Sequence, residues 1–171
     1  MTGKSVTFFL GGARSGKSRL AQELAERQGG SLVYLATGQG FDAEMRERIA
    51  RHRSDRGPRW RTVECAVDLP EAIEREGVAG NVVLVDCLTL WASNLLLAEA
   101  DVGAAQDALI GAIGLARCPV ILVSNEVGLG IVPDNALARR FRDDVGRLHQ
   151  RVAAVADAVW FVAAGLSLRM K

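Results

Sequence analysis

The sequence predicts an α/β fold in which a mostly parallel sheet carries helices on both faces. Short apolar segments alternate along the chain with longer segments of helical periodicity, which is the order of elements in a parallel sheet. A glycine-rich turn joins the first pair of such segments. Only Ala164 and Gly165 separate the last two apolar segments, which predicts a hairpin and an antiparallel strand at one sheet edge. The length of 171 residues suits one domain over residues 1–171.

The expected strands are apolar runs enriched in β-branched and aromatic residues, as in strands buried on both faces of a sheet. The run over residues 60–65 instead alternates apolar and polar side chains, which predicts a place nearer the sheet edge. In chain order, we expect strands over residues 6–10, 31–36, 60–65, 81–86, 119–123, 158–163 and 166–170.

The expected helices repeat apolar residues three and four positions apart and contain strong helix formers. Asp68 precedes one of them and is expected to cap it. In chain order, we expect helices over residues 18–26, 42–54, 69–76, 88–98, 104–115 and 135–156.

The turn after the first strand has the sequence of a phosphate-binding loop. Its glycines let consecutive backbone N–H groups face one anion, and the following helix points its positive end at the same place. Lys17 supplies a charge for the β- and γ-phosphates, and Ser18 supplies a hydroxyl for Mg²⁺. The sequence therefore predicts a P-loop that binds a nucleoside triphosphate. The pattern G-x-x-x-x-G-K-[ST] is matched throughout by Gly11, Gly12, Ala13, Arg14, Ser15, Gly16, Lys17 and Ser18.

Composition argues against several classes of partner. The formal net charge of +1 creates no field that would attract nucleic acid or an anionic membrane. No apolar run approaches the roughly 18 residues of a membrane-spanning helix, and no signal peptide is expected before the first strand. Cys65, Cys87 and Cys118 are widely spaced in apolar surroundings, which indicates reduced core thiols and no zinc site. These features predict a cytoplasmic protein.

Two carboxylates follow expected strands. Asp86 ends the run 81–86 in the manner of a Walker B aspartate, which holds Mg²⁺ directly or through water; the alternative is a cap for the next helix. Glu126 follows the run 119–123 and precedes a glycine-containing loop; the alternative is a solvated loop residue. Because parallel strands end at one edge of a sheet, we expect both side chains near the P-loop.

An arginine-rich segment surrounds one of the two histidines. Seven arginines lie between residues 46 and 61. At about 100° per residue, His52 lies within about 20° of Met45 on a helical projection and extends an apolar stripe, with Arg48 near the same face. A packed histidine, a general base and a nucleophile toward phosphorus remain open for His52. His149 lies in a helix rich in charged residues, where a surface or packing role is expected.

Further segments of the chain have the order and spacing found in one family. The most distinctive are Ser-Asn-Glu-Val-Gly-Leu-Gly-Ile-Val-Pro over residues 124–133 and Ala-Arg-Arg-Phe-Arg-Asp over residues 138–143. With these, the chain resembles the adenosylcobinamide kinase/adenosylcobinamide-phosphate guanylyltransferases, bifunctional enzymes of cobalamin biosynthesis, from about residue 6 to its end. The other matching segments cover the P-loop and residues 34–37, 44–49 with 52, 60–64, 85–91 and 94–96.

The resemblance implies two reactions. A nucleoside triphosphate, ATP or GTP, phosphorylates the aminopropanol hydroxyl of adenosylcobinamide. GTP then gives its GMP moiety to an enzyme histidine, which passes it to adenosylcobinamide phosphate. The guanylylated histidine corresponds to His52, and the resemblance also implies Mg²⁺ and a homotrimer. In this interpretation the catalytic candidates are His52, Lys17, Asp86 and Glu126, the metal ligands are Ser18 and Asp86, and the nucleotide contacts beyond the P-loop are Thr37, Arg48 and Glu64.

The chain departs from the family's pattern at two positions, and two other functions remain open. Arg51 stands where some relatives have a second histidine, and Asp86 stands where some have glutamate. A single-activity small-molecule kinase with the arginine-rich helix as a lid, and a nucleotide-sensing module, remain alternatives. A switch GTPase does not fit, because the chain lacks an Asn-Lys-x-Asp segment. Asp86 and Glu126 are both candidates for the proton acceptor of the kinase step.

Overall fold

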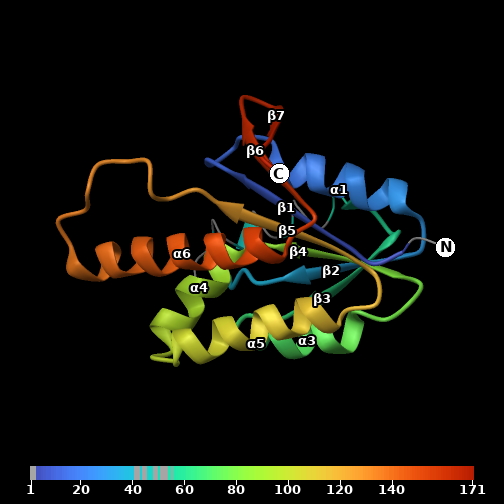
Figure 1. Ribbon diagram of the computed structural model, residues 1–171, viewed down its shortest axis with the longest axis horizontal. Helices are drawn as coiled ribbons and strands as arrows, with labels where there is room; N and C mark the ends of the chain where they lie inside the picture. The colour runs from blue at the N-terminus through green and yellow to red at the C-terminus, as the bar shows by residue number, and fades with distance from the viewer. Residues whose placement is uncertain (1–2, 41–42, 44–45, 48–49, 51–53, 55) are drawn as a thin grey trace.

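A seven-stranded sheet forms the centre of the computed structural model, which describes residues 3–40, 43, 46–47, 50, 54 and 56–171. The strand order is β3-β2-β4-β5-β1-β6-β7 (Figure 1). Only the pair β6–β7 is antiparallel among the paired strands of these residues. The predicted mostly parallel sheet, the terminal hairpin and the edge position of the third strand are confirmed. The strands are β1 (Ser5–Gly11), β2 (Ser31–Ala36), β3 (Trp60–Glu64), β4 (Asn81–Asp86), β5 (Pro119–Asn125), β6 (Ala158–Ala163) and β7 (Leu166–Arg169).

Helices cover both faces of the sheet, as predicted. Helix α1 lies on one face, and the other four described helices lie on the opposite face (Figure 1). The helix expected over residues 42–54 falls largely outside the described residues. The helices are α1 (Lys17–Gln28), α3 (Leu69–Glu76), α4 (Leu88–Leu97), α5 (Val102–Leu115) and α6 (Ala136–Val155).

Helix capping differs from the prediction at one position. Asp68 occupies the N-cap position of α3, but its side chain makes no capping hydrogen bond. The predicted cap is therefore wrong. Side-chain caps occur instead at α5, where Asp101 accepts from Ala104 N, and at α6, where Asn135 accepts from the first helical N–H groups.

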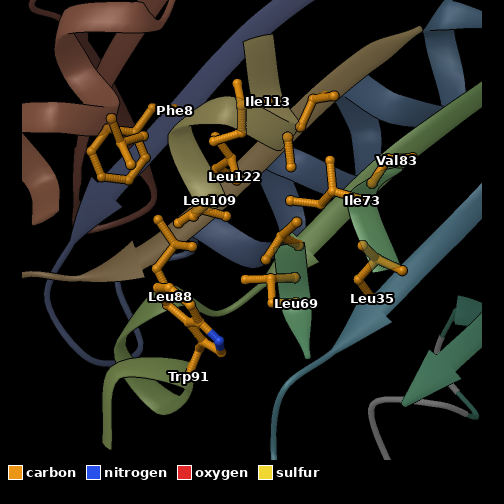
Figure 2. Packing of buried hydrophobic residues seen from close by; sticks show 14 of the residues in the cluster. Phe8, Leu35, Leu69, Ile73, Val83, Leu88, Trp91, Leu109, Ile113 and Leu122 are labelled. Carbon is orange, nitrogen blue, oxygen red and sulfur yellow. The ribbon is translucent and has the colours of Figure 1, made fainter. Parts of the chain in front are cut away.

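The buried side chains form two apolar layers, one on each face of the sheet. Alternate residues of one strand serve the two layers: Phe8 belongs to the layer under α3–α6, and Phe9 to the layer under α1. Figure 2 shows the first layer, which helix residues such as Leu109 and Ile113 complete. The three cysteine thiols are free and buried, as predicted. No described helix is long and apolar enough to cross a membrane.

The carboxyl ends of the parallel strands all lie at the same end of the sheet, which we call the rim. Strand register aligns Gly11 with Asn125, and Ala36 with both Asp86 and Glu64. The six parallel strands therefore deliver the residues that follow them to one side of the molecule. This is the edge at which ligands bind in open α/β sheets.

Candidate active site

The turn from β1 to α1 is shaped as a phosphate cradle. Gly16 has a φ of 96°, a conformation that favours glycine. A Cβ on Gly11 would lie 2.2 Å from the carbonyl oxygen of Val162, so the neighbouring strand leaves no room for a side chain. Lys17 is almost fully buried, and its ammonium group donates to Gly12 O at 2.8 Å. The predicted P-loop residues are therefore held close together, with the lysine folded along the loop.

The terminal hairpin supports the cradle from outside. The N–H of Gly165, in the turn between β6 and β7, donates to Ser15 O at 2.8 Å. The hydroxyl of Ser15 is buried and has no hydrogen-bond partner among the described residues. A buried hydroxyl without a partner costs free energy unless a ligand satisfies it. The buried Ser15 hydroxyl inside the loop therefore fits a site that binds phosphate oxygens.

The end of β4, where Asp86 lies, is fixed by the side chain of Thr37, the residue that follows β2. Thr37 is fully buried, and its hydroxyl donates to Cys87 O at 2.7 Å and accepts from Cys87 N at 2.8 Å. Asn94 of α4 donates to Thr37 O at 2.8 Å. The Thr37 hydroxyl is thus engaged with the residue after Asp86, which makes Thr37 a positioning residue for that carboxylate.

Tyr34 and Arg56 pack together beside the same carboxylate. The Arg56 guanidinium lies 3.5 Å from the centre of the Tyr34 ring, and Arg56 also donates to the Thr62 hydroxyl at 3.4 Å. Burial raises the pKa of Tyr34 well above its usual value, and the charge of Asp86 raises it further. The phenol therefore stays neutral, and Arg56 contacts two strands of the sheet through Tyr34 of β2 and Thr62 of β3.

Glu126 holds the loop that follows β5. Its carboxylate accepts from Gly128 N at 2.6 Å and from Leu129 N at 3.0 Å. Its own N–H donates to Gly11 O at 2.9 Å, which joins this loop to the cradle. Glu126 therefore lies on the rim beside the P-loop, as predicted, with both carboxylate oxygens bound to backbone N–H groups.

A chain of buried polar groups runs beneath the rim from α6 to β5. The Asn125 N–H donates to the Thr89 hydroxyl at 2.7 Å, Thr89 and Ser124 hydroxyls lie 2.8 Å apart, and Ser124 lies 2.7 Å from His149 Nε2. Burial lowers the pKa of His149 to about 4, although the charge of Glu126 acts in the opposite direction. In the tautomer whose Nε2 accepts from Ser124, each hydroxyl in the chain donates once and accepts once. Of the two roles expected for His149, the structure shows packing.

The remaining predicted site residues differ in how the structure places them. Ser18 is half-buried in the first turn of α1, and Glu64 is exposed at the end of β3. His52 and Arg48 lie outside the described residues. Within the described part of the chain, no group of three or more metal-binding His, Cys, Asp or Glu residues occurs. The hydroxyl of Ser18 and the carboxylate of Asp86 are oxygen donors of the type that Mg²⁺ prefers, and Mg²⁺ at nucleotides takes its other ligands from phosphates and water.

Comparison with known proteins now decides the family. The model of the family described as cobinamide kinase/cobinamide phosphate guanyltransferase matches residues 7–170. The chain belongs to this family. It is 47% identical to the bifunctional adenosylcobalamin biosynthesis protein CobP of Pseudomonas aeruginosa over 165 residues, which cover 95% of each chain. It is 42% identical to CobU of Salmonella typhimurium and 43% identical to CobU of Escherichia coli, each covering 97% of this chain and 99% of the relative.

A solved structure resembles the fold at low sequence identity. The ATPase EscN of the enteropathogenic E. coli type III secretion system, solved with its central stalk EscO, matches with a TM-score of 0.58 and 13% identity. The match covers 99% of this chain and 47% of the EscN chain. This likeness supports the P-loop ATPase type of fold and nothing more specific. The predicted fold class and family are confirmed.

Sequence reasoning missed the side chains that support the rim. Thr89 and Asn94 lie in α4, and Ser124 lies near the end of β5, so their positions near the predicted carboxylates were visible. Their hydrogen-bond partners are far away in sequence, 35 residues between Thr89 and Ser124 and 57 between Asn94 and Thr37. Proximity to a predicted site residue was the one available signal, and it did not indicate which partner each side chain would meet.

Proposed function

We propose that this protein phosphorylates adenosylcobinamide with a nucleoside triphosphate and then converts the product to adenosylcobinamide-GDP. The observation that carries the proposal is the family match over residues 7–170 on a chain with a complete phosphate cradle. The kinase half transfers the γ-phosphoryl group to the aminopropanol hydroxyl and releases the nucleoside diphosphate. The transferase half adds GMP to that phosphate through a second nucleotide reaction.

In the kinase half, binding and charge neutralisation do most of the work. The backbone N–H groups from Gly11 to Ser18 surround the β- and γ-phosphates, and Lys17 leaves Gly12 O to contact them. Mg²⁺, when bound, would neutralise charge on the phosphates next to the Ser18 hydroxyl and the Asp86 carboxylate. Thr37 holds the end of β4 through Cys87, so that Asp86 stays in place during the reaction.

In the transferase half, His52 is the proposed nucleophile. Its imidazole attacks the α-phosphorus of GTP, the bond to the bridging oxygen breaks, and pyrophosphate leaves. The phosphate of adenosylcobinamide phosphate then attacks the guanylyl group, which forms adenosylcobinamide-GDP and frees the histidine. Arg48 is proposed to bind the phosphates during this transfer, and Glu64 and the exposed rim beside it are proposed to contact the nucleotide.

Labelling with GTP that carries ³²P at the α-phosphate tests the intermediate. We expect the protein to retain an acid-labile label, because a phosphoramidate hydrolyses in acid. The His52→Ala variant should lose the label and keep its kinase activity. The chain has only two histidines, so His149→Asn is the matched control and should retain the label. A wild-type protein that phosphorylates cobinamide without ever carrying label would reduce the function to that of a kinase.

The proposed function also includes an oligomeric state and a location in the cell. The family resemblance supports a homotrimer that works in the cytoplasm. Strand β7 lies at the sheet edge, and its Leu166 and Leu168, with Met170 after it, are exposed. Contact between copies would cover this apolar strand. Sedimentation equilibrium of the wild-type protein measures the assembly.

A further inference from the structure

The connection between β5 and α6 projects beyond the rim. We call residues 126–135 the rim loop; it extends outward from the end of β5 before α6 begins (Figure 1). The loop starts at the cradle wall, because the N–H of Glu126 donates to Gly11 O at 2.9 Å. The start of the loop therefore lies next to the phosphates that the cradle would hold.

Hydrogen bonds fix the backbone of the rim loop at both ends. At its start, the Glu126 carboxylate accepts from two loop N–H groups. At its end, Arg139 donates to Pro133 O at 2.8 Å and to Asp134 O at 2.6 Å, and Asn135 caps α6. The loop's own hydrogen bonds thus define its shape, which lowers the entropy cost of recognising a ligand.

The rim loop presents apolar side chains to solvent. Leu129 is 81% exposed, Ile131 is 97% exposed and Val132 is 58% exposed. Three apolar side chains within four positions form a cluster that the described part of the chain leaves uncovered. Clusters of this kind, on a backbone fixed by hydrogen bonds, are typical of recognition surfaces.

We propose that Leu129, Ile131 and Val132 form the docking surface for the corrin macrocycle of adenosylcobinamide. This inference rests on the proposed function. The acceptor hydroxyl must reach the γ-phosphate in the cradle, and it is carried on a short arm of a macrocycle too wide to enter the P-loop. The macrocycle must therefore lie outside the rim within the length of that arm, which is where the rim loop begins. Its methyl groups offer apolar area that these three side chains can cover.

The kinase reaction measures this docking directly. The variants are Leu129→Ser, Ile131→Ser and their combination, and exposed positions tolerate such changes with little loss of stability. The matched control is Leu115→Ser. Leu115 is 74% exposed at the end of α5, just before the amino end of β5, and this end of the strand lies away from the rim. We would measure KM for adenosylcobinamide at saturating nucleotide, the nucleotide Kd and the mass by sedimentation equilibrium.

We expect each rim-loop substitution to raise KM for adenosylcobinamide about tenfold, as for the loss of one apolar contact. The nucleotide Kd, kcat and mass should stay unchanged, and Leu115→Ser should behave as wild type. An unchanged KM in the double variant overturns the docking surface while leaving the proposed function intact. A smaller assembly in the same variants assigns the loop to contact between copies and also overturns it. Wild-type protein without turnover of adenosylcobinamide contradicts the proposed function itself, and the docking surface with it.

Discussion

Glu126 and Gly11 join the loop after β5 to the phosphate cradle through one backbone hydrogen bond of 2.9 Å. Gly11 ends β1 and Glu126 follows the neighbouring strand β5, whose register places Asn125 opposite Gly11. The Glu126 side chain turns away from this bond and accepts from Gly128 N and Leu129 N. A carboxylate with both oxygens bound in this way is placed to hold a loop, and less well placed to take a proton from a substrate.

Substitution of Glu126 distinguishes these two roles. We expect Glu126→Gln to keep kcat of the kinase step within about tenfold, because the amide oxygen still accepts from one loop N–H. Asp86→Asn should lower kcat by about 100-fold or more, as expected for a group that acts on the reacting atoms. Steady-state kinetics at saturating substrates provides both values. A kcat for Glu126→Gln as low as that of Asp86→Asn would assign the proton acceptor to Glu126.

Close packing behind the cradle predicts an effect of Gly11→Ala. The new Cβ would lie 2.2 Å from Val162 O and 2.9 Å from the Ser15 hydroxyl, so that β6 or the P-loop must move. We expect the nucleotide Kd to rise at least tenfold, with a stability loss of about 1–3 kcal/mol from overpacking. Calorimetric titration with a non-hydrolysable nucleotide and urea unfolding measure the two effects.

Gly111→Ala is the control for that prediction. Gly111 lies inside α5 and has open space around the Cβ position. Alanine there should stabilise the protein by about 0.5–1 kcal/mol, because it is the better helix former, and should leave the nucleotide Kd unchanged. Equal nucleotide affinity in Gly11→Ala and Gly111→Ala would mean that β6 shifts to accept the new Cβ without disturbing the cradle.

The fold was predictable because burial on both faces leaves a clear pattern in the sequence. Residues 31–36, 81–86 and 158–163 are apolar runs between polar or glycine-containing segments, and the strands β2, β4 and β6 have these same bounds. The capping hydrogen bond expected at Asp68 could not be predicted as reliably from the sequence as the strands. Its φ of −86° and ψ of 36° lie outside the extended conformation from which an aspartate normally caps a helix.

The site was predictable in its position but not in the direction of its side chains. Strand ends placed Thr37, Asp86 and Glu126 on one edge, and the register of the sheet agrees. Spacing along the chain does not say that the Thr37 hydroxyl turns inward to Cys87 or that Glu126 turns to its own loop. These orientations depend on contacts between elements that are dozens of residues apart. His52, the residue on which the transferase half depends, lies outside the described residues.

The double hydrogen bond between Thr37 and Cys87 predicts a specific stability pattern. Thr37→Val keeps the shape of the side chain, but it leaves the buried Cys87 N without its hydrogen-bond acceptor. It also removes one of two hydrogen bonds to Cys87 O, which still accepts from Trp91 N at 3.2 Å. We expect a loss of about 2–4 kcal/mol in the free energy of unfolding, whereas Thr37→Ser should lose less than about 1.5 kcal/mol. Urea unfolding measures both. Equal stability of the valine and serine variants would contradict a structural role for the hydroxyl.

His149 predicts how stability depends on pH. Burial holds the pKa of His149 at about 4 in the native protein, whereas an unfolded histidine titrates near 6.5. Between these values His149 binds more protons in the unfolded chain than in the native chain, so its contribution to the free energy of unfolding rises with pH in this interval and levels off above about 6.5. The contribution of His149 to the rise is on the order of 3 kcal/mol.

His149→Asn should flatten this rise in urea unfolding at pH 4.5, 5.5, 6.5 and 7.5. Asn81→Ala, which removes a hydrogen bond to Glu76 O at the start of β4, should lower stability at every pH and leave the rise unchanged. An equally steep rise in His149→Asn would assign the pH dependence to other groups.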